Sequence, residues 1–169
     1  MKYYLNEVAA ELTSQGPPLT IVIVGGSLLA LLGLRDSTRD VDTIRRLDNE
    51  LVLARDVVAQ RHGLSPTWLN DAAAGFVPVT FRDEDCDPLL ETGRLVAVRP
   101  PYRVVFAMKL LAYRVTDVPD LRRLWGACDF ESAAEAVDFF YESYPHEEFD
   151  EYLTDLIDRS IVAHGSSGG

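Results

Sequence analysis

The sequence predicts a fold of the α/β (α+β) class, a mixed sheet flanked by helices with more helices at the C-terminal end. Short apolar runs alternate with longer stretches of helical spacing, the pattern of a layered α/β domain. Ile21–Val24 stops at two glycines, and Leu95–Val98 lies between Gly93 and Pro100, as expected of buried strands. The C-terminal part shows helical spacing only.

The order of elements follows from apolar periodicity and from the residues that start and stop helices. Ser14–Pro18 breaks the chain before the first strand, Gly63 ends a helix, and Pro100-Pro101 begins another. Thr67 is a candidate cap for a short helix. The expected helices cover residues 3–14, 28–34, 47–62, 67–74, 102–114, 118–127, 131–143 and 147–163, and the expected strands cover 21–24, 40–42, 76–81 and 95–98.

Length and composition indicate one globular domain. The chain has 169 residues, of which 47% are hydrophobic, so it is long enough for a substantial core. It contains no run of 18 apolar residues and no signal-peptide core, so we expect no membrane partner. Two cysteines, Cys86 and Cys128, are too few for a disulfide framework or a zinc site. They are typical of free thiols in a cytoplasmic protein.

The negative charge of the chain is concentrated near its end. The formal net charge is −11, yet residues 129–169 hold 11 acidic residues and one basic residue, while residues 1–128 hold 16 and 15. We therefore expect a core over residues 1–128, acidic helices over 129–163 packed on the same domain, and a disordered tail over 164–169. The acidic helices could bind a basic partner or shield a site, and the near-neutral core remains compatible with a nucleic-acid partner.

A glycine-rich turn after the first strand suggests a phosphate site. Gly25 and Gly26 allow a tight turn and a close approach of a ligand to the backbone. Ser27 opens the following helix, so we expect its hydroxyl and the free N–H groups of the helix start to point toward the turn. Such groups bind anions, and phosphate is the common case.

Two carboxylates on the second strand suggest a metal site. Asp40 and Asp42 are two residues apart in an extended segment, so both should project to one face, with Val41 toward the core. Converging carboxylates repel each other unless a cation lies between them. Mg²⁺ (or Mn²⁺) is typically held by one or two carboxylates together with substrate phosphates.

Taken singly, both patterns have ordinary explanations, because Gly-Gly is most often a plain turn and Asp-x-Asp a solvated strand edge. Their combination is more specific. Gly25-Gly26-Ser27 followed by Arg35, Thr38, Asp40 and Asp42 resembles the signature of the DNA polymerase β-type nucleotidyltransferase superfamily. Within it, the chain is similar to the AbiEii/MenT toxin group and to small relatives of the domain-of-unknown-function 6036 type.

A second motif extends this resemblance, which covers residues 19–125. Lys109 lies on an expected helix and is followed by Arg114 and by Asp117-x-x-Asp120-Leu121, as in the family. Without the resemblance, Lys109 is equally a lysine extending from a surface helix, and Asp117 is a helix cap. A Trp-Leu-Asn turn, here Trp68-Leu69-Asn70, is also typical of the small relatives.

The resemblance implies a site for nucleotidyl transfer. The implied catalytic residues are Asp40, Asp42, Lys109 and Asp120, the implied metal ligands are Asp40 and Asp42, and the implied nucleotide-binding residues are Gly25, Gly26, Ser27, Arg35, Arg39 and Lys109. Many members use a third carboxylate on a neighbouring strand. The expected strand 95–98 has none, and Asp83 lies beyond another strand. Asp120, which the resemblance matches through the second motif, is the preferred substitute, and a one-metal site is compatible with the sequence.

The implied activity is transfer of a nucleoside monophosphate from an NTP to an acceptor hydroxyl. Toxin relatives modify the acceptor end of tRNA, so tRNA or another RNA is the leading acceptor, and a toxin–antitoxin pair with a cognate protein partner is the implied setting. A protein or small-molecule hydroxyl is a weaker alternative. In a different reading, the fold is retained without catalysis, as an interaction or antitoxin-type protein.

Overall fold

The computed structural model describes residues 1–36, 38 and 40–163, which form two compact units. The first unit comprises Met1–Phe76 and Cys86–Pro100, and the second comprises Val77–Asp85 and Pro101–Gly169. The expected boundary between the core and the acidic helices lay at residue 128. The structure instead groups the helices that follow Pro100 with the acidic C-terminal helices.

The first unit is built on a five-stranded mixed sheet, which confirms the α+β class. The strands are β1 (Leu19–Val24), β2 (Val41–Thr43), β3 (Leu69–Asn70), β4 (Asp87–Thr92) and β5 (Leu95–Arg99). Their order is β3-β2-β1-β5-β4. The central strand β1 runs parallel to β5 and antiparallel to β2, while β2 and β3 are parallel and β4 and β5 antiparallel. The last four residues of β1 are buried, as its continuous apolar run predicts.

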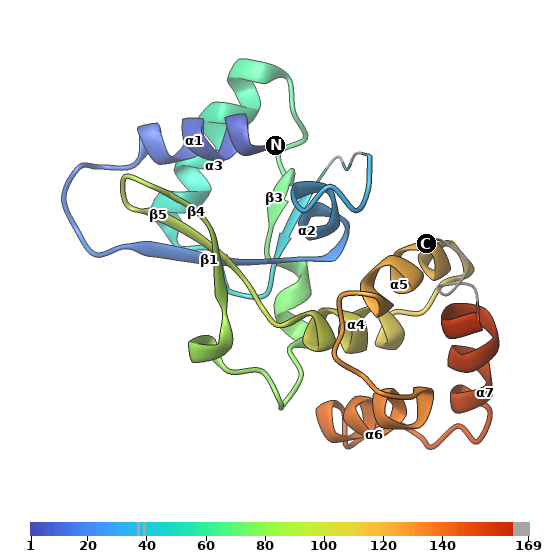
Figure 1. Ribbon diagram of the computed structural model, residues 1–169. Coiled ribbons are helices and arrows are strands. Elements are labelled where there is room, and N and C mark those ends of the chain that lie inside the picture. The colour runs from blue at the N-terminus through green and yellow to red at the C-terminus, as the bar shows by residue number, and fades with distance from the viewer. Residues whose placement is uncertain (37, 39, 164–169) are drawn as a thin grey trace. The chain divides into compact units, whose positions relative to one another are not determined.

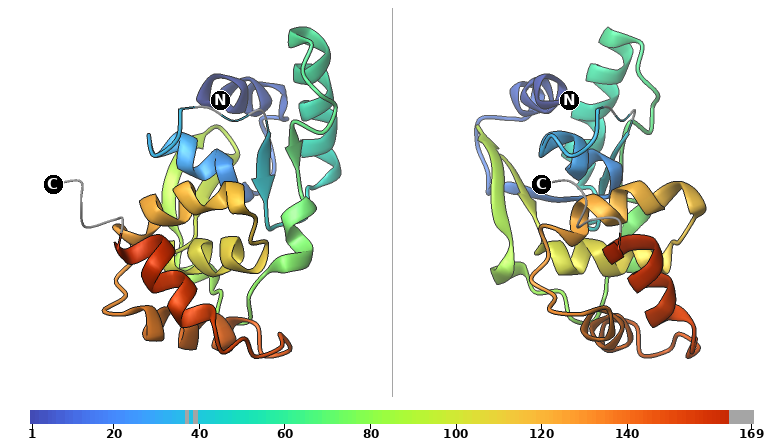
Figure 2. Two further views of the ribbon diagram at one scale, coloured as in Figure 1. Left: turned by 90° about the vertical axis from the view of Figure 1, so that its right-hand side faces the viewer. Right: turned by 45° about the vertical axis from the view of Figure 1, so that its right-hand side comes forward.

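Helices α1 (Lys2–Glu11), α2 (Gly25–Leu31) and α3 (Asn49–His62) complete the first unit. Figures 1 and 2 show α1 and α3 side by side, and the two helices are in contact. Helix α3 ends at His62 as expected, because Gly63 adopts a left-handed conformation after the last turn. It begins two residues later than expected, at Asn49, because the Asp48 side chain caps the helix by accepting from the N–H of Glu50. Trp68 is 2% exposed and packs against Tyr4, with ring centroids 5.8 Å apart.

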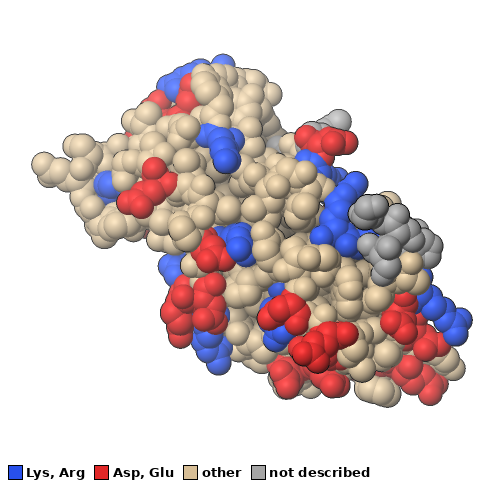
Figure 3. Space-filling model, viewed as in Figure 1, with Lys and Arg blue, Asp and Glu red and all other residues tan. Residues whose placement is uncertain are grey.

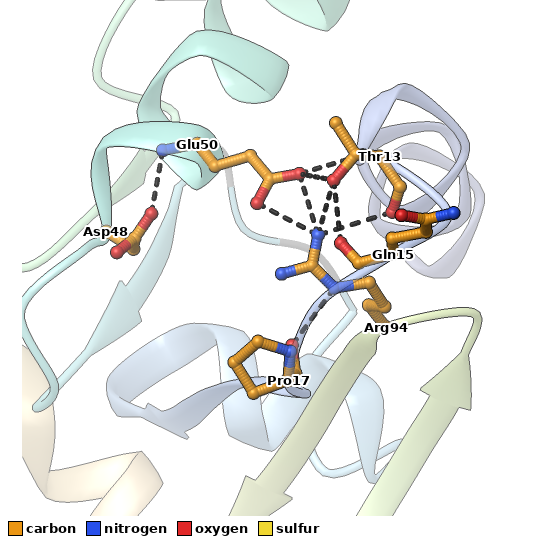
Figure 4. Close-up of polar contacts among 6 residues, drawn as sticks. All are labelled: Thr13, Gln15, Pro17, Asp48, Glu50 and Arg94. Carbon is orange, nitrogen blue, oxygen red and sulfur yellow. Dashed lines mark hydrogen bonds and ion pairs between the residues drawn. The ribbon is translucent and has the colours of Figure 1, made fainter.

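A polar cluster ties the loop before β1 to α3 and to the β4–β5 turn (Figure 4). Arg94 donates to both carboxylate oxygens of Glu50 at 2.9 Å, to the Thr13 hydroxyl at 2.7 Å and to the Pro17 carbonyl at 3.0 Å. Thr13 in turn donates its backbone N–H to Glu50 at 2.7 Å. Because hydrogen bonds to charged groups are among the stronger ones, this cluster holds the start of the central strand in place.

One expected strand is absent, and two strands, β3 and β4, were not expected. Phe76–Phe81 is not a strand; Phe76 ends the 3₁₀ helix η1 (Ala72–Phe76), and the segment that follows carries the 3₁₀ turn η2 (Asp83–Asp85). One of the unexpected strands is β4, an edge strand whose register shifts near Pro88. Proline cannot donate to a sheet ladder and is confined to edges and bulges, so the strand lacked the usual signal. The expected helix 67–74 was also wrong, since Leu69–Asn70 pairs with β2.

The second unit is helical, with α4 (Tyr102–Leu111), α5 (Val118–Trp125), α6 (Ala133–Ser143) and α7 (Leu153–Ile157). A 3₁₀ turn (Val115–Asp117) precedes α5, and a π-helical turn (Asp158–Val162) follows α7. The helix expected over 147–163 therefore starts only at Leu153 and ends in the π-helical turn. Phe106 is fully buried, with its ring centroid 5.8 Å from that of Trp125. Among the described residues, no helix is long and apolar enough to cross a membrane. Neither cysteine forms a disulfide.

Candidate functional site

The candidate site is the bend between β1 and α2. Strand β1 ends at Val24, and Gly25 then takes a φ of +67°, which only glycine adopts without strain. In the antiparallel ladder of β1 and β2, Val24 lies opposite Asp42. The register therefore places Asp42 beside the bend, because residues paired across a ladder are neighbours in space.

The carboxylate of Asp42 lies against Gly25. A Cβ atom added to Gly25 would lie 3.0 Å from Oδ2 of Asp42, so close that the carboxylate would have to shift by a few tenths of an ångström. The glycine thus serves two purposes, since it permits the left-handed backbone and leaves room for the carboxylate. A site shared by a metal ion and a phosphate requires an acidic residue to face the glycine bend, and Asp42 does so.

A guanidinium group lies on the next residue of the bend. A Cβ atom added to Gly26 would lie 2.8 Å from Nη1 of Arg35 and 3.6 Å from the hydroxyl oxygen of Thr38. Arg35 is exposed. The two glycines are therefore flanked by an anion, Asp42, and a cation, Arg35, and an exposed guanidinium can bind a phosphate through two parallel hydrogen bonds.

Asn70 orients the carboxylate, and sequence reasoning did not assign it a functional role. In the parallel ladder of β2 and β3, Asn70 is the partner of Asp42, and its Nδ2 donates to Oδ1 of Asp42 at 3.0 Å. The same amide donates to the Thr67 carbonyl at 3.3 Å, while its oxygen accepts from the N–H of Ala72 at 3.0 Å. With Oδ1 held by Asn70, Oδ2 is the oxygen turned to Gly25.

Ser27 holds the bend to β2. Its side chain is fully buried, and its hydroxyl donates to the Val24 carbonyl at 2.7 Å and accepts from the N–H of Asp42 at 3.3 Å. We expected this hydroxyl to face the turn as a phosphate ligand. The structure instead uses it to join two backbone segments, which helps to set the position of Asp42.

Two further residues were expected at this site, Asp40 and Arg39. Asp40 directly precedes β2 and is exposed, while Val41 is buried at 1% exposure, as the alternation along an extended chain predicts. The backbone carbonyl of Asp40 accepts a hydrogen bond from the Thr38 hydroxyl at 3.3 Å. Arg39, an expected nucleotide ligand, lies outside the described residues.

Lys109 and Asp120 belong to the second unit and pair with each other. Nζ of Lys109 lies 2.9 Å from Oδ2 of Asp120 and 3.5 Å from Oδ1 of Asp117. Arg123 approaches the other oxygen of Asp120 at 3.4 Å. Lys109 is 9% exposed and Asp120 is 4% exposed, so this is a buried charge network within the helices.

The Asp42 carboxylate beside the bend has the chemistry of a ligand for a hard divalent cation. Carboxylates are the ligands that Mg²⁺ and Mn²⁺ prefer, and Oδ2 of Asp42 is not the oxygen that Asn70 holds. Within the described part of the chain, no group of three or more His, Cys, Asp or Glu side chains has the spacing of metal ligands. Any metal held by Asp40 and Asp42 would therefore take further ligands from substrate oxygens or water.

Comparisons of the chain with protein-family models, with curated proteins and with solved structures found no match. The function is accordingly inferred from the bend itself and from the motifs that form it.

Proposed function

We propose that the chain is a metal-dependent nucleotidyltransferase that moves a nucleoside monophosphate from an NTP to an acceptor hydroxyl. The observation that carries the proposal is the position of Asp42. Its Oδ2 lies so close to the bend that a Cβ atom added to Gly25 would be only 3.0 Å from it. A carboxylate fixed beside a glycine bend can share a metal ion with a phosphate that approaches the same backbone.

Each residue in or beside the bend has a separate role in the proposed reaction. Gly25 and Gly26 let the phosphates approach the backbone, and Arg35 neutralises charge on them. Asp40 and Asp42 would hold Mg²⁺ or Mn²⁺, which when bound withdraws charge from the phosphates and lowers the pKa of a coordinated oxygen. Asn70 keeps the Asp42 carboxylate in one orientation. Preorganised positioning of this kind supplies most of the catalysis in phosphoryl-type transfers.

The proposed reaction is a displacement at the α-phosphorus of the NTP. The acceptor hydroxyl oxygen forms a bond to that phosphorus, the bond to the bridging oxygen of pyrophosphate breaks, and the hydroxyl proton passes to solvent. Pyrophosphate leaves with the negative charge that Arg35 is placed to stabilise. The parts expected of Arg39, Lys109 and Asp120 in this chemistry stay predictions.

The proposed acceptor is RNA, with the 3′ end of tRNA first. The support is the resemblance of Gly25-Gly26-Ser27 and Asp40-x-Asp42 to the toxin group, whose members modify tRNA. In that setting the chain would act in the cytoplasm, as a toxin restrained by a cognate antitoxin protein. A protein hydroxyl would be the acceptor if label from the NTP appeared in protein instead.

A labelling experiment tests the proposal. The protein is incubated with each α-labelled NTP, Mg²⁺ and total tRNA, and we expect label in RNA for at least one NTP. Asp42→Ala should abolish labelling without lowering the melting temperature appreciably, because the Asp42 side chain is only partly buried. The assignment of the site is wrong if Asp42→Ala labels RNA as well as the unchanged protein does.

A second candidate function, a non-catalytic interaction or antitoxin-type protein, is favoured by the buried pairing of Lys109 with Asp120. In this reading the second motif of the family has a structural role in the helices, and the bend is a remnant. No labelling with any NTP, and no melting shift on adding an NTP with Mg²⁺, would support this candidate over the first.

A further inference from the structure

A groove of about 210 Å³ opens in the second unit where the end of α4, helix α6 and helix α7 meet. Its apolar lining includes Leu110, Phe140 and Leu153, each less than 9% exposed, together with Leu156. Small-molecule sites usually enclose about 300–1,000 Å³, so the groove is small for a ligand of that kind. It is suited to apolar side chains of a protein partner.

Two exposed aromatic residues lie on the segment that borders this groove. Between α6 and α7, Phe149 is 77% exposed and Tyr152 is 69% exposed, and the adjacent Glu148 and Asp150 line the groove. A single exposed aromatic residue needs no explanation, but aromatic residues beside an apolar groove are typical of the residues that dominate binding energy at protein interfaces.

The bordering segment is held in shape by Tyr141. The Tyr141 hydroxyl accepts a hydrogen bond from the N–H of Asp150 at 2.7 Å and donates to the Glu148 carbonyl at 3.4 Å. The ring of Tyr141 also packs on that of Phe149, with centroids 5.5 Å apart. A surface that is already ordered loses less conformational entropy on binding than a flexible one.

The rim of the groove is acidic. Glu147, Glu148 and Asp150 line it and are exposed, and among the described residues no ion pair engages Glu147 or Glu148. Residues 129–169 carry 11 acidic side chains and one basic side chain. Figure 3 shows acidic side chains gathered over the part of the second unit that holds α6 and α7. This charge repels phosphate backbones, anionic lipid surfaces and a second acidic copy of the same face.

We propose that this acidic groove, formed by the apolar floor and the rim of Glu147, Glu148 and Asp150, binds a basic amphipathic helix of a partner protein. The apolar face of the helix packs on the floor and against Phe149, and its lysine or arginine residues lie beside the rim. This is the helix-in-groove mode of recognition, in which apolar anchors supply affinity and complementary charge supplies orientation and encounter rate.

A labelled peptide provides the test. The probe is a fluorescein-labelled helical peptide with leucines at i, i+4 spacing on one face and lysines on the other, and its binding to the full chain is measured by fluorescence anisotropy. Two matched peptides carry serine in place of each leucine, or glutamate in place of each lysine. We expect each matched peptide to bind at least about tenfold more weakly. Raising the salt from about 0.1 M to about 1 M should also weaken binding, since the Debye length falls from about 10 Å to about 3 Å.

Surface variants locate the binding site. Phe149→Ser and the double variant Glu147→Lys/Glu148→Lys should each weaken binding of the basic peptide by about tenfold or more. The control is Leu53→Ser, at a leucine of the first unit that is 67% exposed. Unchanged binding in both groove variants would overturn the proposal. So would equal binding of the glutamate peptide, or a concentration-dependent dimer that Phe149→Ser abolishes, because the occupant would then be a second copy.

Discussion

The side-chain amide of Asn70 donates a hydrogen bond to Oδ1 of Asp42 across 3.0 Å, between residues that are partners in the ladder of β2 and β3. The bond leaves Oδ2 turned to the glycine bend. A two-residue strand thus determines the orientation of the carboxylate on which the proposed chemistry depends.

Asn70→Ala should reduce transfer activity by about 10–100-fold, the usual cost of losing a residue that orients a metal ligand. The half-maximal Mg²⁺ concentration for labelling should rise as well, because a carboxylate that can rotate binds the cation less well. Asn49→Ala, at an exposed asparagine at the start of α3, is the control and should label RNA normally. Equal Mg²⁺ dependence in Asn70→Ala and in the unchanged protein would mean that Asn70 does not position a metal ligand.

Gly25→Ala should lose both stability and activity. At φ +67° the alanine costs about 1–2 kcal/mol in unfolding free energy, and its Cβ would displace the Asp42 carboxylate. Gly33→Ala is a matched control, because Gly33 has a φ of +73° and no atom within 4 Å of the added Cβ. Urea unfolding should show similar losses of stability in the two variants, while only Gly25→Ala should lose activity. Equal activity in both would contradict the packing of Asp42 on Gly25.

Lys109→Met should destabilise the protein by about 3–5 kcal/mol, because Asp120, which is 4% exposed, loses its nearest cation and keeps only the longer contact with Arg123. Adding Asp120→Leu to the same chain should recover part of this loss, since the buried carboxylate that lost its nearest cation is then absent. Chemical denaturation measures both variants. Lys2→Met, at the exposed first residue of α1, should change the unfolding free energy by less than about 0.5 kcal/mol. A Lys109→Met protein that is as stable as the Lys2→Met protein would argue against a structural role.

The stability of the first unit should depend on pH through Glu7. Hydrogen bonds from Tyr3, His62 and Arg61 lower the pKa of Glu7 from 4.5 to about 2. Because the folded-state pKa lies below the unfolded value, this contribution is fully present above pH 4.5 and is lost as the pH falls toward 2.

Melting temperatures measured across that window check the assignment. Glu7→Gln should flatten the fall in melting temperature between pH 4.5 and pH 2, relative to the unchanged protein. Glu91→Gln, at an exposed position of β4, should leave the fall unchanged. Identical profiles for Glu7→Gln and for the unchanged protein would show that the hydrogen bonds to Glu7 do not stabilise the fold.

Much of the first unit was predictable because its signals are local. The apolar run that ends at Gly25 marks β1 and the bend, and Gly63 marks the end of α3. The burial of Val41 between two acidic residues follows from the alternation of an extended strand. In each case the residues that determine the structure lie next to the element they determine.

The features that sequence reasoning missed depend on partners far along the chain. Strand β3 has two residues and exists only through its pairing with β2, so Asn70 could be placed beside Asp42 only once the register was known. Likewise Ser27 was expected to face a ligand, and its burial follows from bonds to Val24 and Asp42. The grouping of α4 and α5 with the C-terminal helices reflects packing between residues far apart in the sequence, which the helix-start signal Pro100-Pro101 does not reveal.

The most direct measurement is a crystal structure of the protein with Mg²⁺ and an NTP analogue that cannot be cleaved at the α-phosphorus. The account predicts that the triphosphate lies on the backbone of Gly25 and Gly26, with the metal ion bound to Oδ2 of Asp42 and with Arg35 contacting a phosphate. A triphosphate bound elsewhere while Oδ2 of Asp42 holds no metal would contradict it.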